Sequence, residues 1–234
     1  MRDRRRAAGP VSRFLRDNAL SLGFGAIFLA SLAFQAISGR NGFNHDQLLH
    51  HGDPINLWPY ISSSLFWTDV MENWQSEYLQ FTLYILATVY LVQRGSTESK
   101  APGEEGAESD AEQRVGRHAD EDSPRWAAVG GFRTMLYSSS LVLVMAAIWL
   151  ASWLAQSITG RINYNANQLD HQAAPVSWPR YLTTSDFWNR TLQNWQSEFL
   201  AVGSMVILSV YLRQRGSAES KPVGAPHGET GSEG

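Results

Sequence analysis

Long apolar stretches alternate with polar segments along this chain. Residues 19–38 run for 20 positions without a charged side chain, and residues 135–158 run for 24. At about 1.5 Å of rise per residue, 20 helical residues span about 30 Å, which matches the hydrocarbon core of a bilayer. Helices of a soluble bundle should have a polar outer face, but these stretches are apolar all round. We therefore predict two membrane-crossing helices here.

A shorter apolar stretch follows each of these. Residues 78–92 and 199–212 contain 15 and 14 positions without a charge, which would span about 21–23 Å of helix. Extending each helix upstream makes up the length but draws Glu77 and Glu198 toward the membrane. The prediction is an all-α integral membrane protein with four transmembrane helices, arranged as two tandem helix–loop–helix repeats.

The two halves of the chain are copies of one another. At an offset of 121 residues Gln35 meets Gln156, and the run NWQSE at 73–77 recurs at 194–198. Other matching pairs are Gly39 with Gly160, Arg40 with Arg161, Asn44 with Asn165, Phe66 with Phe187, Trp67 with Trp188 and, after a one-residue slip, Trp58 with Trp178. This period indicates a tandem duplication. It also argues that residues 19–38 are no cleaved signal peptide, because their counterpart is internal.

Composition divides the chain further. Residues 101–125 hold eight acidic and three basic side chains and few apolar ones, so they cannot bury enough surface to offset the entropy of ordering. We predict a basic N-terminus (1–13), a first repeat (14–100), a disordered acidic linker (101–132), a second repeat (133–221) and a disordered tail (222–234).

Basic side chains predict the orientation in the membrane. The outer loops of the two repeats, near residues 39–73 and 160–194, hold only Arg40, Arg161, Arg180 and Arg190 of the 19 Lys and Arg residues. The other 15 lie in the N-terminus, the linker and the segments that begin or end each repeat. Because cytoplasmic segments carry the excess of basic residues, we expect both termini and the linker in the cytoplasm and both loops outside.

Tryptophans mark the edges of the outer loops. Pro54 and Pro175 exclude a continuous helix through the loops. Residues 64–74 have the spacing of an amphipathic helix, and we expect them to lead straight into the second helix of the repeat. Tryptophan prefers the headgroup level of a bilayer, so an interfacial aromatic belt is predicted from Trp58, Trp67, Trp74, Trp178, Trp188 and Trp195.

The repeated run NWQSE contains the most distinctive polar side chains. Asn73 and Glu77 lie four residues apart and project from one helix face, as do Asn194 and Glu198. A carboxylate at the mouth of a membrane helix is costly in contact with lipid. One hypothesis is that the two glutamates line a polar cavity that binds a cation or relays protons. The other is that each glutamate lies at a helix start, favours the helix dipole and pairs with a loop arginine.

Loop histidines and acids are the candidates for metal binding. His50 and His171 recur, with Asp170 beside the second, but no two-histidine spacing recurs. We expect hydrogen-bonded surface histidines instead of a metal site. The chain has no cysteine, and it shows no Ser-His-Asp order, phosphate-binding loop or HExxH motif. We therefore predict no catalytic residue, no metal, no cofactor and no enzymatic activity.

Each repeat closes with the same polar motif, QRGSTESK or QRGSAESK. Gly95 and Gly216 suit a left-handed helix C-cap, and Arg94 and Arg215 complement the negative end of the helix dipole. Capping and anchoring at phospholipid headgroups explain most of this motif. A regulatory or partner-binding role is the alternative.

The strings FW-x5-NW-x-SE-[FY]-L and RGS-x-ESK resemble a family of small bacterial membrane proteins of unknown function. An upstream N-x-x-Q-x-x-H segment completes the resemblance, formed here by Asn44, Gln47 and His50 and again by Asn165, Gln168 and His171. Members of that family typically carry one copy of the repeat, whereas this chain carries two. The resemblance implies the bacterial inner membrane and no known activity. Single-copy relatives would then pair as dimers, and this chain would be a fused version of such a dimer.

Three classes of function stay open. We favour a non-enzymatic inner-membrane protein that acts through membrane packing or partner interaction, because nothing in the spans resembles a polar conduit. The alternatives are a small ion or proton channel or transporter that uses Glu77 and Glu198, and a membrane enzyme that uses loop His, Asp and Glu side chains. The expected partners are the lipid bilayer and either a second copy of the chain or another membrane protein, with no nucleic acid.

Overall fold

The computed structural model describes residues 9–231 and is all-α over that range, with no strand among them. The chain divides into two compact units, the first ending at Trp67 and the second beginning at Thr68. The basic run predicted at the N-terminus, residues 2–6, lies outside the described residues, as do the last three residues of the tail.

The first compact unit consists of a short helix, a long helix and a short return segment. α1 (Pro10–Asp17) begins at a proline, whose fixed φ and missing N–H suit the first helical turn. The helix breaks at Asn18, where φ is −120°, and α2 (Ala19–Leu49) then runs for 31 residues. α3 (Leu57–Ile61) follows, and the first turn of α4 (Ser64–Tyr90) ends this unit.

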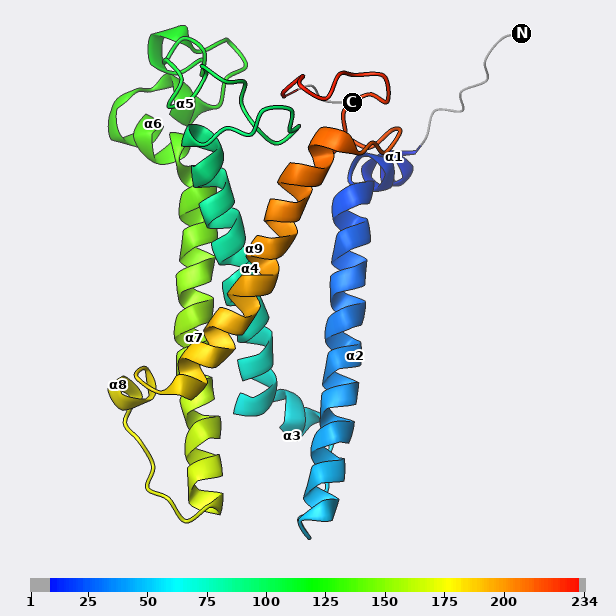
Figure 1. Cartoon of the computed structure of the whole chain (residues 1–234), viewed down its shortest axis with the longest axis vertical. Coiled ribbons are helices and arrows are strands. Elements are labelled where there is room, and N and C mark those ends of the chain that lie inside the picture. The colour runs from blue at the N-terminus through cyan, green and yellow to red at the C-terminus, as the bar shows by residue number, and fades with distance from the viewer. Residues whose placement is uncertain (1–8, 232–234) are drawn as a thin grey trace, which may run out of the picture. The chain divides into compact units, whose positions relative to one another are not determined.

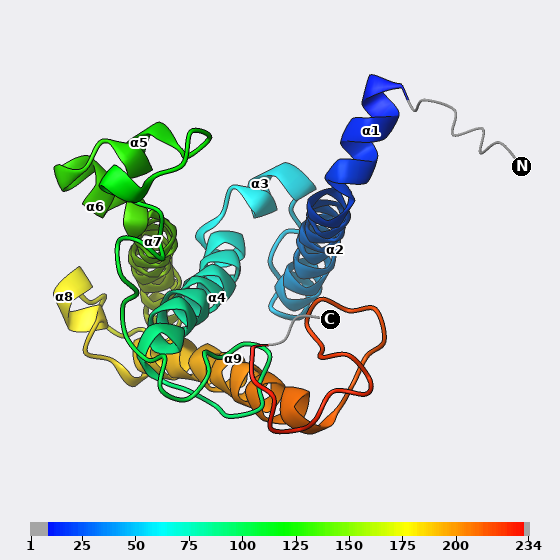
Figure 2. The same ribbon diagram turned by 90° about the horizontal axis from the view of Figure 1, so that it is seen from above.

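The second compact unit contains the rest of α4 and two further long helices, α7 (Ser140–Asp170) and α9 (Ser185–Tyr211). α9 crosses α4 and α7 obliquely (Figures 1 and 2). The end of α4, the start of α7, the linker and the tail gather at one end of this unit, and α8 lies toward the other (Figure 1). The shorter elements are η1 (Gly116–His118), α5 (Arg125–Ala128), α6 (Gly131–Ser138) and α8 (Trp178–Tyr181).

The long helices repeat along the chain at the same spacing as the sequence motifs. α7 begins at Ser140, 121 residues after the start of α2 at Ala19, and both helices have 31 residues. α9 follows α4 at the same offset, and both have 27 residues. The break at Asn18 returns at Ser139, where φ is −111° between α6 and α7. The short helix before each long helix therefore belongs to the repeated pattern.

The long helices extend further than their apolar stretches predict. α2 ends at Leu49 and α7 at Asp170, so the loops predicted near 39–73 and 160–194 are wrong in extent. Polar side chains do not end a helix while its backbone hydrogen bonds continue, and the first proline that would break them is Pro54 in one copy and Pro175 in the other.

Both long helices end in the same backbone motif. His51 and its counterpart Gln172 adopt the left-handed conformation, with φ of 60° and 58°. The next N–H donates back to the helix, from Gly52 to the Gln47 carbonyl and from Ala173 to the Gln168 carbonyl, each at 2.7 Å. This is the Schellman ending, in which the last helical carbonyls are satisfied by the turn that follows.

α4 runs without a break from Ser64 to Tyr90, which confirms that residues 64–74 lead straight into the second helix of the repeat. Among the described residues, α2 and α7 are long and apolar enough to cross a membrane. In the most apolar 18-residue stretch of each, only 6% and 17% of the residues are buried. Their apolar side chains therefore face outward. α4 and α9 do not meet the same criterion, and each begins with a polar third.

The predicted linker forms turns and two short helices, η1 and α5. The Lys100 ammonium lies 2.8 Å from the Glu108 carboxylate, and the Arg114 guanidinium lies 3.2 Å from that of Asp120. Most side chains between these pairs are exposed. The predicted disorder of this segment stays a prediction.

Candidate functional site

The predicted polar residues of NWQSE lie in the middle of their helices. Glu77 is thirteen positions after Ser64 and Glu198 is thirteen after Ser185, which places each about 20 Å from the helix start. The helix dipole acts only within the first turn, so the interpretation of these residues as helix-start carboxylates is wrong. Sequence reasoning missed this because α4 and α9 begin well before their apolar parts.

The two glutamates lie on neighbouring helices of the second compact unit. Glu77 is exposed and Glu198 is half-buried. The Ser76 hydroxyl, which donates to the Asn73 carbonyl at 2.9 Å, also lies near the Glu198 carboxylate, and the charge of Glu77 is close enough to repel that of Glu198. The structure therefore brings together the acids that the sequence singled out. The two asparagines do not join them, because Asn73 donates to the Asp69 carbonyl and Asn194 to the Arg190 carbonyl, each at 2.9 Å.

An ion-pair chain beside these glutamates was missed by sequence reasoning. The Arg190 guanidinium on α9 lies 3.1 Å from the Glu72 carboxylate on α4 and 3.3 Å from that of Asp186. The Tyr181 hydroxyl donates to Asp186 at 3.0 Å. The Glu72 side chain is only 13% exposed, so its charge depends on Arg190. The spacing of Asp186 and Arg190 was a signal for one pair, but no local pattern linked Glu72 to them.

Further polar side chains are buried where α4, α7 and α9 meet. The Trp195 indole N–H donates to the Gln75 amide oxygen at 2.8 Å, and the Asn163 amide donates to the Thr68 hydroxyl at 2.8 Å. Gln75 is fully buried and Gln156 is 1% exposed. Within the described range, neither the amide nitrogen nor the amide oxygen of Gln156 has a hydrogen-bond partner. The interior between these helices is thus more polar than their outer surface.

The recurring histidines are exposed helix caps. The His50 Nδ1–H donates to the Asp46 carbonyl at 2.9 Å, and the His171 Nδ1–H donates to the Asn167 carbonyl at 2.8 Å. This confirms the prediction of hydrogen-bonded surface histidines. Over residues 9–231 no group of three or more His, Cys, Asp or Glu side chains is placed to hold a metal ion.

An aromatic contact holds the short loop helix on the long helix in both copies. Tyr60 and Tyr181 are buried, and each hydroxyl presses on a helical glycine, Gly39 in one copy and Gly160 in the other. A Cβ at Gly160 would lie 2.5 Å from the Tyr181 oxygen. Ring contacts continue to Phe66 at 5.9 Å from Tyr60, and to its counterpart Phe187 at 5.6 Å from Tyr181.

The loop asparagines complete this contact. The Asn44 amide group both donates to and accepts from the Ile55 backbone, at 2.9 and 2.8 Å, and Asn165 does the same with Val176, at 3.0 and 2.8 Å. The N-x-x-Q-x-x-H segment therefore ends the long helix and fastens the chain that returns from it.

The six predicted belt tryptophans fall into two groups. Trp58, Trp67, Trp178 and Trp188 are exposed, as a belt requires, whereas Trp74 and Trp195 are half-buried. The Trp195 ring lies 6.2 Å from that of Trp153 on α7, so it contributes to helix packing. The position of the exposed four at a bilayer surface stays a prediction.

The motifs that close the two copies meet each other in the second compact unit. Gly95 and Gly216 have φ of 89° and 82°, but α4 and α9 have already ended, so the prediction of a helix C-cap is wrong. Each glycine is the third residue of a turn, closed by the Ser96 N–H on the Gln93 carbonyl in the first copy. A left-handed third residue is what a type II turn requires.

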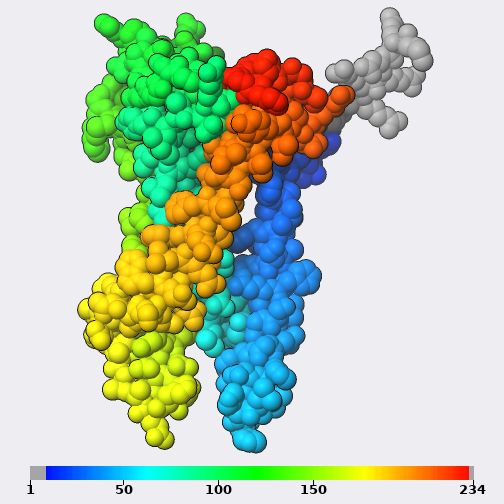
Figure 3. Space-filling view, in the orientation of Figure 1, coloured from blue at the N-terminus to red at the C-terminus, as the bar shows by residue number. Residues whose placement is uncertain are grey.

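Lys221 joins this first turn to the tail. It is 1% exposed, and its ammonium donates to the carbonyls of Gly95, Pro226, His227 and Glu229 at 2.6, 3.2, 3.0 and 3.0 Å. Burial and the charge of Arg213 lower the pKa of Lys221. In Figure 3 the tail (red) lies against the segment that follows α4.

Two carboxyl groups share this contact. A hydrogen bond with the Glu219 carboxyl, together with partial burial and the Glu219 charge, raises the pKa of Glu98. The Tyr84 hydroxyl donates to Glu98 at 3.3 Å and acts in the opposite direction. The contact therefore favours the protonated form of Glu98.

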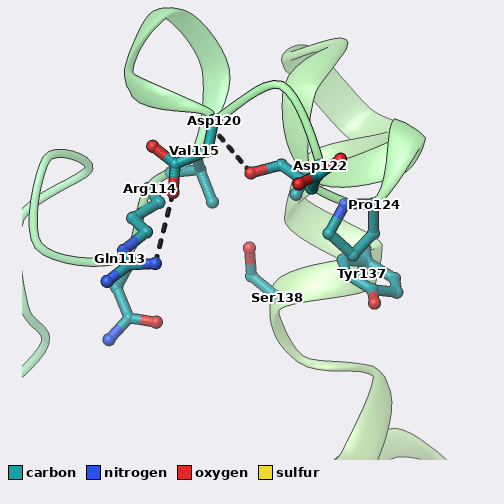
Figure 4. Close-up of a pocket in the computed structure, with 10 residues that line it drawn as sticks. Gln113, Arg114, Val115, Asp120, Asp122, Pro124, Tyr137 and Ser138 are labelled. Atoms are coloured by element: carbon teal, nitrogen blue, oxygen red, sulfur yellow. Dashed lines mark hydrogen bonds and ion pairs between the residues drawn. The ribbon is translucent and has the colours of Figure 1, made fainter.

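A polar hollow of about 490 Å³ lies in the linker (Figure 4). Arg114 and Asp120 lie on one side of it, and Asp122 lies on the other side with Tyr137 of α6. None of the residues predicted as functional contributes to this lining. The hollow belongs to the fold of the linker on α6.

Comparison with known proteins identifies the family. A family model described as a domain of unknown function (DUF6766) matches residues 11–232. The match runs through both copies of the repeat and the segment between them. No curated protein and no solved structure matches the chain. Because the family model covers far more than half of its residues, the chain belongs to the DUF6766 family, whose function is unknown.

Proposed function

We propose that this chain is a non-enzymatic, multi-pass protein of the bacterial inner membrane, crossed by α2, α4, α7 and α9. The observation that carries the proposal is the outward-facing apolar surface of α2 and α7. In the most apolar 18-residue stretch of each helix, only 6% and 17% of the residues are buried. Exposure of that apolar surface to water would cost about 25 cal/mol of free energy for each Å². Lipid removes the cost.

The arrangement of the second compact unit supports an even number of crossings. The segments after α4 and after α9 lie at the same end and contact each other through Lys221 and Gly95. If α7 and α9 cross a membrane in opposite directions, the segments after α4 and after α9 lie on the same side of it. With the excess of Arg and Lys on this side, we assign the linker and both termini to the cytoplasm.

Helix packing and contact with partners are the proposed mode of action. Polar side chains buried between the helices bind one another: Glu72 pairs with Arg190, and Gln75 accepts a hydrogen bond from Trp195. Such contacts hold membrane helices together where no hydrophobic force between helices is available. A second copy of the chain or another membrane protein would bind along the exposed helix faces.

Cysteine labelling tests the topology without a background, because the chain has no cysteine. Ala174→Cys lies in the exposed loop before α8 and Ser109→Cys in the exposed linker. A membrane-impermeant maleimide should label Ala174→Cys in intact spheroplasts, and Ser109→Cys only after lysis. Labelling of Ser109→Cys from outside, or purification of the chain as a monodisperse protein without detergent, would contradict the proposal.

Ion or proton passage is the second candidate, favoured by the approach of Glu77 to Glu198. Two like charges on adjacent membrane helices attract a cation or share a proton. Liposomes that contain the chain would then conduct, and Glu77→Gln with Glu198→Gln would abolish the flux. Flux that is unchanged in the double variant removes this candidate and leaves the first.

A further inference from the structure

The same apolar hollow occurs in both copies of the repeat. One, of about 560 Å³, lies between α2 and the α3 segment in the first compact unit. The other, of about 320 Å³, lies between α7 and the α8 segment in the second. Each residue that lines the second hollow has its repeat counterpart in the lining of the first, for example Leu150 with Leu29 and Trp188 with Trp67. A hollow built twice from matching positions is a feature of the repeat.

The walls of these hollows accept hydrocarbon. In the second copy, the Trp178 indole N–H donates to the Ser157 hydroxyl and the Trp188 N–H to the Leu182 carbonyl, each at 3.0 Å. Both rings have therefore satisfied their only donor and present carbon to the hollow. Tyr181, which packs on Gly160, contacts the lining residue Phe187 with ring centroids 5.6 Å apart.

An arginine lies one helical turn beyond each hollow. Arg40 follows Ala36 by four residues, and Arg161 follows Ser157 by four, so each pair shares a helix face. The Nε atoms of both arginines are buried and have no hydrogen-bond partner among residues 9–231. In the proposed topology this turn is nearer the outer membrane surface. The guanidinium suits a phosphate, which it binds through two parallel hydrogen bonds.

We propose that each copy binds one phospholipid of the outer leaflet, with an acyl chain in the hollow and an anionic headgroup on Arg40 or Arg161. This inference rests on the proposed membrane function. The occupant is a lipid because the hollow is continuous with the outward-facing apolar surface: Leu29 is 63% exposed and Leu150 is 53% exposed. In the proposed topology the arginine lies nearer the outer membrane surface than the apolar hollow does. The headgroup of an outer-leaflet phospholipid likewise lies nearer that surface than its acyl chains.

The lipid stoichiometry of the full chain tests this proposal. The chain is inserted into vesicles of phosphatidylglycerol and phosphatidylcholine, extracted in mild detergent, and its retained lipids are counted by native mass spectrometry. Wild type should retain two phosphatidylglycerol molecules. Leu154→Trp fills the hollow of the second copy and should remove one, and Ala33→Trp should remove the other. Ala30→Trp and Leu143→Trp, on exposed positions outside the hollows, are the matched controls and should retain both.

Arginine variants provide a second readout that does not depend on filling the hollow. Arg161→Ala should weaken retention of phosphatidylglycerol in the second copy about tenfold, as the loss of a charge-assisted hydrogen bond predicts. It should weaken phosphatidylcholine retention less, because the choline cation offsets the charge of the phosphate. The proposal is overturned if the Ala33→Trp, Leu154→Trp double variant keeps both lipids, or if the control variants lose them equally. A chain that does not insert into vesicles at all would contradict the membrane function instead.

Discussion

The tyrosine–glycine contact and the NWQSE run both occur in the two copies of this chain, but only the first of these two forms the same structure twice. The tyrosine on glycine contact of the outer loop is built identically, with Tyr60 on Gly39 and Tyr181 on Gly160. The NWQSE run is not: Gln75 and Ser76 are buried, whereas their counterparts Gln196 and Ser197 are exposed. The first motif contacts only its own copy. The second depends on which helix lies beside it.

The copies differ in sequence where they contact each other. Arg190 occupies the position that corresponds to Asp69, and it binds Glu72, whose own counterpart is the uncharged Gln193. A dimer of identical chains must place the same residue at both positions, so a positive charge on one and a negative charge on the other require a fused chain. A chain that carries both copies can therefore form an asymmetric polar contact between α4 and α9 that a homodimer of single copies would lack.

Removing Arg190 should have the largest effect. Arg190→Ala leaves the Glu72 carboxylate, which is 13% exposed, without its partner. Loss of one member of a buried pair costs about 3–5 kcal/mol, and we expect about 3 kcal/mol of the free energy of unfolding because Arg190 is partly exposed. Chemical unfolding in detergent measures it. Arg180→Ala, an exposed arginine on the neighbouring α8, is the control and should change stability by less than about 0.5 kcal/mol. Equal effects of the two would show that the asymmetric ion pair is unimportant.

The symmetric contact should break at either glycine. Gly160→Ala places a Cβ 2.5 Å from the Tyr181 oxygen. Overpacking of this kind costs about 2 kcal/mol, and the higher helix propensity of alanine offsets up to about 1 kcal/mol of that cost. Gly39→Ala should cost a similar amount against Tyr60. Gly203→Ala is the control, because a Cβ there meets nothing within 4 Å in the described part of the chain, so it should stabilise α9 by up to about 1 kcal/mol. A large loss at only one of Gly39 and Gly160 would break the equivalence of the two copies.

Sequence patterns predicted the local parts of this fold and missed the parts that depend on distant residues. The all-α class followed from the length of the uncharged stretches, and the continuous start of α4 followed from the amphipathic spacing of residues 64–74. The extent of α2 did not, because residues 39–49 are largely polar yet contain no proline to stop a helix. The C-cap at Gly95 was wrong because positive φ is required equally by a turn after the helix. The Glu72 to Arg190 pair joins residues 118 positions apart, and no spacing along one helix could show it.

The divergent motif should respond to mutation in one copy only. Gln75→Ala removes the acceptor of the Trp195 indole N–H and leaves space in a fully buried site, and we expect a loss of about 1–2 kcal/mol in the free energy of unfolding. Gln196→Ala, the same change at the exposed counterpart, should cost less than about 0.5 kcal/mol. Similar losses at both positions would mean that NWQSE is packed alike in the two copies.

The smallest effect is expected where the two copies meet in a like-charged contact, at Glu98 and Glu219. Because the pKa of Glu98 is raised by its hydrogen bond with Glu219, the stabilisation is complete below the usual glutamic acid pKa of 4.5 and is lost as the pH rises through the raised value. Amide hydrogen exchange of residues 95–99 and of the tail should therefore show more protection at pH 4 than at pH 7, after correction for the intrinsic exchange rate. Glu98→Gln keeps a neutral donor at every pH and should make protection independent of pH over this range. Glu121→Gln, an exposed linker variant, should behave like wild type; loss of the pH dependence in this variant too would assign it to the linker charge and not to the contact between the two copies.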